Sequence, residues 1–272
     1  MDKFRKLFKT KKPIIGMVHL MPLLGYEEFP GIDKVLKKAI IDAKTLEKGG
    51  VNGILIENNY DYPHAITVGP ETVACMSLIV SGIKKRVSVP LGICVLWNDF
   101  EAAFSIASTV GAQFVRVPVF VDKVKTSYGI VKGDSKAVNK ARIRLKAEKI
   151  LLFVDIHVKH SQVLNSESIT QSAKAAIKKG ADGVIVTGKW TADSPAIEEL
   201  EVVKKEATET PVIVGSGATY KNVRKLLTYA DAIIVGTALK TGAERKENIN
   251  IKSFEEKVSL KRVKQFMKEV KI

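Results

Sequence analysis

The chain repeats one local pattern eight times: a short apolar run rich in β-branched residues, then a stretch with apolar residues at helical spacing. The apolar runs are IIGMV, GILIE, LGICVLW, FVRVPV, ILLFVDIHV, GVIVTG, PVIVG and AIIVG, which begin at residues 14, 53, 91, 114, 150, 183, 211 and 232. Continuous apolar strands of this kind are typical of parallel sheets covered by helices. Eight strand–helix units predict an α/β fold, the closed (β/α)8 TIM barrel, with a doubly wound open sheet as the alternative.

The helical stretches begin and end with residues that favour helix termini. DKVLKKAIIDAKTLEKGG starts with Asp33 as an expected N-cap and stops on glycines, and SITQSAKAAIKKGA starts with Ser168. We find no linker rich in Pro, Gly or Ser between these units. The sequence therefore predicts a single barrel domain over residues 14–272, preceded by a basic amphipathic segment over residues 1–13.

Composition narrows the class of protein. With 272 residues and an apolar fraction of 46%, the chain is expected to be globular with a sizeable core. Its two cysteines, Cys75 and Cys94, fall on different predicted elements without metal-ligand spacing, so neither a disulfide nor a zinc site is expected. The sequence also lacks an apolar run of bilayer length and a signal-peptide pattern, which predicts a cytoplasmic protein.

The net charge of +15 raises the question of an anionic partner. Lysines are spread along the predicted helices among glutamates, and no nucleic-acid-binding motif accompanies them, so we expect solvated helix faces and no specific nucleic-acid partner. At the N-terminus, Phe4, Leu7 and Phe8 share one helical face. This face is expected to cap the lower mouth of the barrel, and peripheral contact with an anionic membrane is the alternative. Homo-oligomerisation stays open.

The string PVIVGSGAT ends a predicted strand on three small residues. Either the chain turns sharply there, or an anion approaches its N–H groups closely. In TIM barrels, the loops after the seventh and eighth strands commonly bind a phosphate through backbone N–H groups. Ala218 and Thr219 are expected to open the next helix, with the Thr219 hydroxyl as its cap. The predicted phosphate site comprises Gly215, Ser216, Gly217, Gly236 and Thr237, and a tight turn without a ligand is the alternative.

Polar residues at the carboxyl ends of the other strands are expected to complete the site, because TIM barrels carry their active sites at that end. In the fifth strand, alternation places Asp155, His157 and Lys159 on one face. The inward side chains expected from the first, second and fourth strands are His19, Glu57 and Arg116. Charges inside a barrel are costly without partners, so a paired cluster of Glu57, Arg116, Asp155 and His157 is predicted, either catalytic or purely structural.

Seven strings of the chain carry a resemblance: IGMVHLMPL, ENNYDYP, VLWND, DIHVKH, VIVTGKWT, PVIVGSGAT and ADAIIVGTALK. In their order and spacing the chain resembles the BtpA/SgcQ family of barrels over nearly its whole length. That family is similar to the ribulose-phosphate-binding barrels, so the resemblance implies a phosphorylated ligand, either a sugar phosphate or a nucleotide phosphate. The residues expected to contact the substrate are His19, Asn58, Arg116 and Thr187.

The chain also departs from the pattern of that family. Cys94 stands where an amide is expected, and Pro118, Phe120, Ser127 and Tyr128 replace Asn, His, Asp and Gln. The pocket thus loses several polar groups, while Glu57, Asp155, His157 and Lys159 are retained. Either this chain binds a different ligand from its relatives, or it has kept binding and lost catalysis.

Three mechanisms are open for the retained residues. The favoured one makes Asp155 or Glu57 a general base and His157 a general acid, as an isomerase, epimerase or sugar-phosphate lyase requires. In the second, Lys159 or Lys189 forms a Schiff base with a carbonyl substrate. In the third, Glu57, Asp155, His157 and His160 bind a divalent metal. We expect a site without a metal or other cofactor in preference to this third mechanism. A different class of function, implied by the resemblance, is a non-catalytic assembly factor for a membrane complex.

Overall fold

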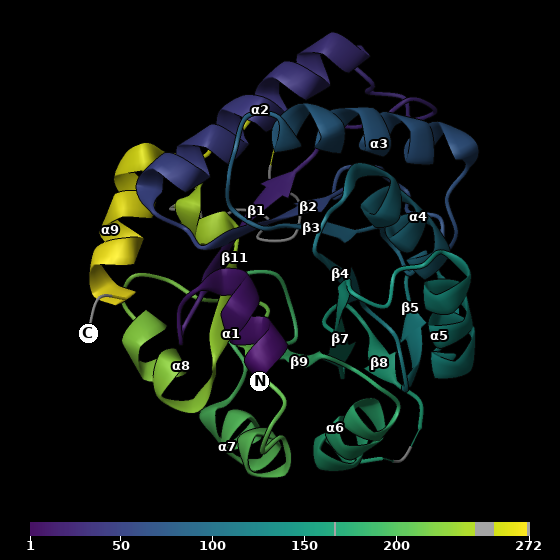
Figure 1. Cartoon of the computed structure of the whole chain (residues 1–272), viewed down its shortest axis with the longest axis vertical. Helices are drawn as coiled ribbons and strands as arrows, with labels where there is room; N and C mark the ends of the chain where they lie inside the picture. Colours follow the sequence, from purple (N-terminus) through teal and green to yellow (C-terminus); the bar gives the residue numbers. More distant parts are fainter. Residues whose placement is uncertain (166, 243–252, 271–272) are drawn as a thin grey trace.

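The computed structural model describes residues 1–165, 167–242 and 253–270, and it confirms the predicted closed barrel. Eight parallel strands form it in the order β1, β11, β10, β9, β7, β4, β3 and β2 (Figure 1). Their bounds are β1 (Ile14–His19), β2 (Gly53–Glu57), β3 (Leu91–Cys94), β4 (Phe114–Val117), β7 (Leu151–Ile156), β9 (Gly183–Val186), β10 (Val212–Val214) and β11 (Ala232–Val235). All eight apolar runs of the sequence thus supply one barrel strand each.

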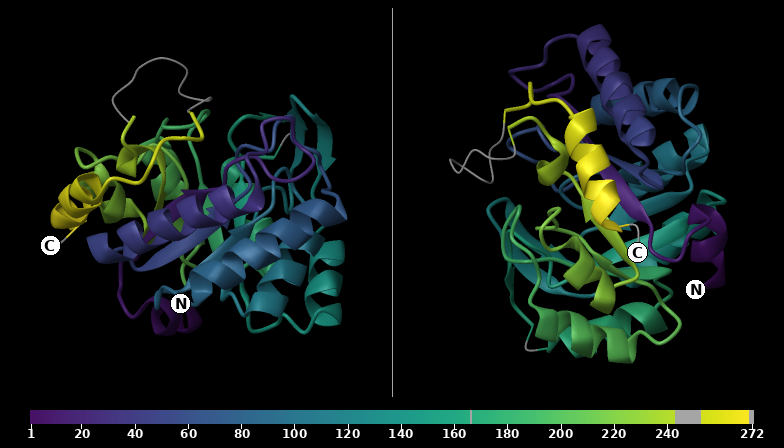
Figure 2. Two further views of the ribbon diagram at one scale, coloured as in Figure 1. Left: turned by 90° about the horizontal axis from the view of Figure 1, so that it is seen from above. Right: turned by 90° about the vertical axis from the view of Figure 1, so that its left-hand side faces the viewer.

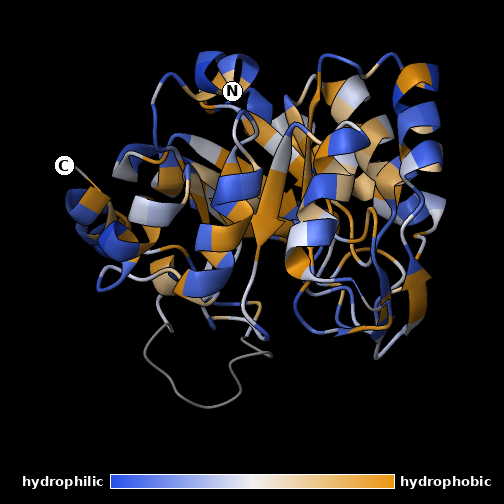
Figure 3. Cartoon of the chain, turned by 90° about the horizontal axis from the view of Figure 1, so that it is seen from below, coloured by the Kyte–Doolittle hydropathy of each residue, from blue (hydrophilic) through white to orange (hydrophobic). Residues whose placement is uncertain are grey.

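Amphipathic helices surround the barrel, with their apolar faces inward and their polar faces outward (Figure 3). They are α2 (Ile32–Gly49), α3 (Pro70–Lys84), α4 (Phe100–Val110), α5 (Ser135–Arg144), α6 (Ile169–Lys178), α7 (Ile197–Glu206), α8 (Val223–Tyr229) and α9 (Leu260–Val270). Ser168 caps α6 in a capping box with Gln171, as its sequence predicts. The predicted Asp33 cap is wrong, because α2 begins one residue earlier and Gly31 occupies the N-cap position.

A short helix, α1 (Asp2–Phe8), lies across the amino-terminal end of the barrel (Figures 1 and 2). Phe4 and Phe8 are buried there, with ring centroids 5.8 Å from Phe153 and 5.6 Å from Phe114 respectively. The barrel interior therefore covers the apolar face of α1, and this segment closes the lower mouth. Among the described residues, no helix combines the length and the apolar character that crossing a bilayer requires.

The sequence patterns did not predict a small antiparallel sheet, β6–β5–β8, at the opposite end of the molecule (Figure 2). It consists of β5 (Lys123–Thr126), β6 (Gly129–Lys132) and β8 (Gln162–Val163), from the segments that follow β4 and β7. Its strands are short and half polar, so they read as loops in the sequence. This sheet supplies part of the wall of the larger of the two cavities described below.

Candidate functional site

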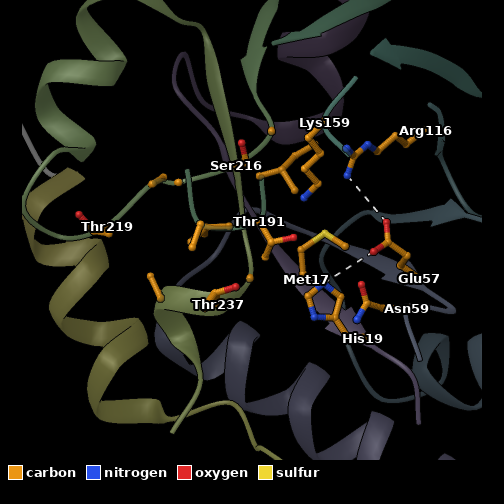
Figure 4. Close-up of a pocket in the computed structure, with 18 residues that line it drawn as sticks. Met17, His19, Glu57, Asn59, Arg116, Lys159, Thr191, Ser216, Thr219 and Thr237 are labelled. Atoms are coloured by element: carbon orange, nitrogen blue, oxygen red, sulfur yellow. Dashed lines mark ion pairs between the residues drawn. The ribbon is translucent and has the colours of Figure 1, made fainter. Parts of the chain in front are cut away.

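A cavity of about 110 Å³ opens at the carboxyl ends of the barrel strands, where the loops after β10 and β11 meet (Figure 4). The residues of the predicted phosphate site all line it: Gly215, Ser216, Gly217, Gly236 and Thr237. In Figure 4, Thr219 and Thr237 lie on the side opposite Arg116 and Glu57. The cavity is therefore bounded by bare backbone on one side and by charged side chains on the other.

The two loops carry backbone N–H groups that are free to bind a ligand. Within the described part of the chain, no acceptor is found for the N–H groups of Ser216, Gly217 and Ala218. Thr237 and Ala238 open the single 3-10 turn η1 (Thr237–Leu239), so their N–H groups have no partner inside that turn, and no other acceptor is found among the described residues. Unpaired N–H groups at a cavity wall suit an anion.

The small residues after β10 also have a structural reason. The Ser216 hydroxyl donates to the Asp193 carbonyl at 2.6 Å and accepts from the Gly188 N–H at 2.9 Å, which ties this loop to the loop after β9. Gly217 has a φ of +68°, and a Cβ there would lie 2.1 Å from the backbone nitrogen of Ser194. The side chain of Ser216 is thus already used, and an anion would meet backbone donors.

The expected helix start after this loop is wrong. Helix α8 begins at Val223, and residues 218 and 219 belong to the loop. The Thr219 N–H donates to Oδ1 of Asn222 at 2.7 Å, so an asparagine side chain, and not the Thr219 hydroxyl, organises this turn. The extra loop length leaves the N–H groups of residues 216–218 outside any helix.

A buried ion cluster forms the opposite wall. Arg116 donates from Nε and Nη2 to the two carboxylate oxygens of Asp155, both at 2.8 Å. Its Nη1 lies 3.8 Å from Oε2 of Glu57, and Oε1 of Glu57 lies 3.8 Å from Nε2 of His19 (Figure 4). The structure thus brings together Glu57, Arg116 and Asp155, as strand alternation predicted. Both carboxylate oxygens of Asp155 accept hydrogen bonds from Arg116, and Asp155 does not line the cavity. Glu57 does line it.

Lys159 reaches the same cavity from the segment after β7 (Figure 4). Burial, followed by the neighbouring Arg116, lowers the pKa of the Lys159 amine. Its backbone N–H donates to Oγ1 of Thr187 at 3.0 Å, so Thr187 holds this segment in place without lining the cavity. Desolvation therefore destabilises the charged form of Lys159, whose side chain lies at the edge of the cavity.

His157 does not share the inward face with Asp155. Strand β7 ends at Ile156, and His157 has a φ of +48°, which breaks the alternation that the sequence argument assumed. Its backbone N–H donates to Oδ2 of Asp122 at 2.9 Å, and its ring is not among the residues that line this cavity. Alternation predicts facing only while the backbone stays extended, and the extended backbone of β7 ends one residue before His157.

Asn58 is likewise withdrawn from the cavity. Its Oδ1 accepts from the Leu96 N–H at 2.7 Å, and its Nδ2 donates to Oδ2 of Asp61 at 3.1 Å, so the side chain joins the segments after β2 and β3. The next residue, Asn59, lines the cavity instead. Both asparagines belong to the string ENNYDYP. Because β2 ends at Glu57, strand alternation does not predict which of the two side chains faces the cavity.

Sequence analysis also missed Lys240, a buried lysine just after η1. Its Nζ lies 2.7 Å from Nδ1 of His19 and 3.4 Å from the Tyr60 hydroxyl. Burial lowers the pKa of Lys240 to about 8. Burial, and next the charge of Lys240, lower the pKa of His19 well below its usual value. Because an ammonium only donates, Nδ1 of His19 is the acceptor and the ring proton sits on Nε2, the nitrogen nearest Glu57.

A second and larger cavity, of about 1040 Å³, adjoins the first and shares with it Glu57, Asn59, Arg116, Lys159 and Thr191. Aromatic rings supply much of its wall: Tyr60, Tyr62, His64, Trp97, Tyr128, His160, Trp190 and Phe254. Of the residues that depart from the family pattern, Pro118, Ser127 and Tyr128 line this cavity. The departures therefore concentrate in the larger cavity, away from the phosphate loops.

The other two departures lie in the interior. Cys94 is fully buried inside the barrel, and burial, followed by the charge of Glu57, raises the pKa of its thiol well above the usual value. Phe120 is fully buried in the layer between barrel and helices. Neither side chain lines the smaller cavity, so these two substitutions alter the packing behind the site and not its lining.

The remaining candidates take no part in the smaller cavity. Lys189 is exposed, and His160 pairs through Nε2 with Oγ1 of Thr191 at 2.8 Å. Within the described ranges, no three His, Cys, Asp or Glu side chains lie close enough to share a metal ion. Between the carboxylates of Glu57 and Asp155, the guanidinium of Arg116 supplies the positive charge.

Comparison with known proteins shows which family this chain resembles. The family model described as the BtpA family matches residues 10–271. An uncharacterized protein of Methanocaldococcus jannaschii is 42% identical over 248 residues, which cover 90% of this chain and 93% of that protein. The photosystem I biogenesis protein BtpA of Synechocystis is 38% identical over 253 residues, covering 92% and 86%.

Among solved structures, a similar fold occurs in (S)-3-O-geranylgeranylglyceryl phosphate synthase from Thermoplasma acidophilum in complex with sn-glycerol-1-phosphate. The TM-score is 0.60 at 18% identity, with 99% of this chain and 97% of that chain covered. At this identity the likeness concerns the fold alone.

Proposed function

This chain belongs to the BtpA family, and we propose that it binds a phosphorylated small molecule at the carboxyl end of its barrel and catalyses a proton transfer on it. The unpaired backbone N–H groups of residues 216–218 and of Thr237 and Ala238 carry the proposal. Grouped donors of this kind bind a phosphate without side-chain help. The Lys159 amine adds positive charge across the cavity. In the synthase structure with a similar fold, the bound molecule is also a phosphate ester, sn-glycerol-1-phosphate.

Glu57 is the side chain best placed to move a proton. It is the one carboxylate among the described residues that line the smaller cavity, and it is fixed by Arg116 and His19 at 3.8 Å each. A carboxylate held beside a bound phosphate is suited to abstract a proton next to a carbonyl group. Lys159 would stabilise the negative charge that develops on the carbonyl oxygen. An isomerase, epimerase or lyase of a phosphorylated sugar uses these roles.

A Schiff base at Lys159 is a second candidate, which one observation favours. Burial lowers the pKa of this amine, and a nucleophilic lysine must lose its proton before it attacks a carbonyl. Borohydride reduction in the presence of each candidate substrate, followed by peptide mass spectrometry, tests this route. A covalent adduct on Lys159 would establish it, and an unmodified Lys159 during measurable turnover would exclude it.

The assembly role has less support in this structure. It comes to this chain only from the name of the Synechocystis relative, and the apolar face of α1 that a membrane would need packs on Phe114 and Phe153. A site with free anion donors, a buried carboxylate and a desolvated lysine is better explained by a ligand than by a scaffold.

Calorimetric titration with pentose, hexose, triose and nucleotide phosphates tests the binding, and deuterium incorporation from solvent tests the chemistry. We expect at least one compound to bind and to exchange a carbon-bound hydrogen. Glu57→Gln should keep the binding and abolish the exchange, because an amide cannot accept the proton. Binding without exchange in the native protein would rule out proton abstraction, and absence of binding by the whole panel would overturn the phosphate site.

A further inference from the structure

Two of the aromatic side chains that line the larger cavity are exposed to solvent. Tyr62 and Trp190 are 65% and 54% exposed although both line it. Tyr62 packs edge-on against His64 and Tyr128, with centroids 6.1 Å away in each case. Grouped exposed rings around a cavity mark a surface that a ligand covers.

The rings stand on separate segments of the chain. Tyr62 and His64 follow β2, and Tyr128 belongs to the turn between β5 and β6. His160 and Trp190 follow β7 and β9, with ring centroids 5.5 Å apart. Two aromatic groups from different loops thus border one space of about 1040 Å³, which holds a ligand larger than a phosphate.

The wall between the rings is polar. Lys125, Ser127, Ser161 and Gln162 line the same cavity. A purely aliphatic tail would desolvate these groups without giving them hydrogen bonds, which costs free energy. A planar heteroaromatic ring offers two faces for stacking and a polar edge for such groups, so it matches both features of the wall.

From this juxtaposition we propose that the ligand of the site is a nucleotide, with its phosphate on the loops after β10 and β11 and its base among the rings of the larger cavity. The inference rests on the proposed phosphate site. It places the ribose against the side chains that the two cavities share, Glu57, Asn59 and Lys159. Glu57 then lies beside the ribose, between the two anchored ends, where its carboxylate can accept a proton from a hydroxyl group.

The two tryptophans of the chain, Trp97 and Trp190, both line the larger cavity, so intrinsic fluorescence reports on it directly. The probes are the four common ribonucleoside 5'-monophosphates, ribose 5-phosphate, which lacks the base, and the nucleosides, which lack the phosphate. At least one monophosphate is expected to bind about tenfold or more tighter than ribose 5-phosphate and to quench the fluorescence, since its base stacks on the aromatic rings. Ribose 5-phosphate should bind without quenching.

Trp190→Ala separates the base from the phosphate. This exposed residue lies outside the phosphate loops, so the variant should fold, lose about tenfold in affinity for the monophosphate and keep its affinity for ribose 5-phosphate. The control is Ile143→Ala, because Ile143 on α5 is likewise exposed, at 65% against 54% for Trp190, and lines neither cavity. Equal affinities for ribose 5-phosphate and all four monophosphates, or tight binding of another sugar phosphate alone, would overturn the nucleotide while leaving the phosphate site intact. If no phosphorylated probe binds, the phosphate site fails as well.

Discussion

Lys240 Nζ lies 2.7 Å from Nδ1 of His19, which places a buried lysine against the imidazole that neighbours Glu57. Nδ1 accepts from the ammonium, so Nε2 keeps its proton on the Glu57 side. Because this imidazole is neutral, Glu57 has one full positive charge paired with it among the described residues, that of Arg116, and its carboxylate can act as a base. His19 ends β1 and Lys240 follows η1 just after β11, and the pairing of β1 with β11 brings these two segments together.

Lys240→Met should raise the pKa of His19, because the charge of Lys240 is the second cause, after burial, that lowers it. The chain contains four histidines, so their imidazole protons are few enough to follow individually by NMR titration. The control is Lys174→Met, which removes a surface cation paired with Glu206. A His19 titration that is unchanged in Lys240→Met would contradict the role assigned to Lys240.

Lys240 should also make stability depend on pH in the alkaline range. Its pKa in the fold is about 8, below the unfolded value of 10.5, so between these values the unfolded chain binds more protons. The native protein should therefore gain unfolding free energy from this group as the pH rises from about 8 to about 10.5. Urea unfolding across this range measures the slope. In Lys240→Met the gain should be smaller, and an identical slope would show that Lys240 is not desolvated.

Asp155→Asn should destabilise the protein by about 3 kcal/mol, because Arg116 then loses its bidentate carboxylate partner inside the barrel and keeps only the 3.8 Å contact with Glu57. Denaturant unfolding gives the value. The matched control is Glu101→Gln, which breaks an exposed pair with Arg144 and should cost less than about 1 kcal/mol. Similar losses of unfolding free energy in both variants would mean that the buried pair contributes no more to stability than the exposed pair.

Gly217→Ala should weaken phosphate binding at least tenfold, which is about 1.4 kcal/mol. A Cβ at this position would meet the backbone of Ser194, so the loop that carries the N–H groups must move. Gly50→Ala is the control, because Gly50 also has a positive φ but has open space around its missing Cβ. It should lose about 1–2 kcal/mol of stability and keep its phosphate affinity. Calorimetry with inorganic phosphate that finds equal affinities in both variants would argue against the anion site.

Phe8→Ala should lower the unfolding free energy by about 3–5 kcal/mol, because Phe8 is 4% exposed and packs on Phe114 inside the lower mouth. Lys3→Ala, an exposed change on the same helix, should have little effect. Binding to anionic liposomes is expected to be absent in the native protein and in both variants. Liposome binding that Phe8→Ala abolishes without loss of stability would instead support a membrane role for α1.

The sequence by itself determined the barrel and the location of the two loops for which we propose phosphate binding. Each strand is a local apolar run, and strand alternation fixes which residues face inward while the backbone stays extended. This argument was sufficient to bring Glu57, Arg116 and Asp155 together and to place Gly215, Gly217 and Gly236 at one cavity.

Only the tertiary structure decided what happens beyond the strand ends. The positive φ of His157 takes its side chain out of the alternation, and the hydrogen bonds of Asn58 and Thr187 commit them to holding loops. Lys240 reaches His19 across 221 positions of the chain, a contact that no local pattern records. Loop residues are placed by long-range hydrogen bonds and packing and not by a repeating backbone geometry, so their facing has no periodic signal in the sequence.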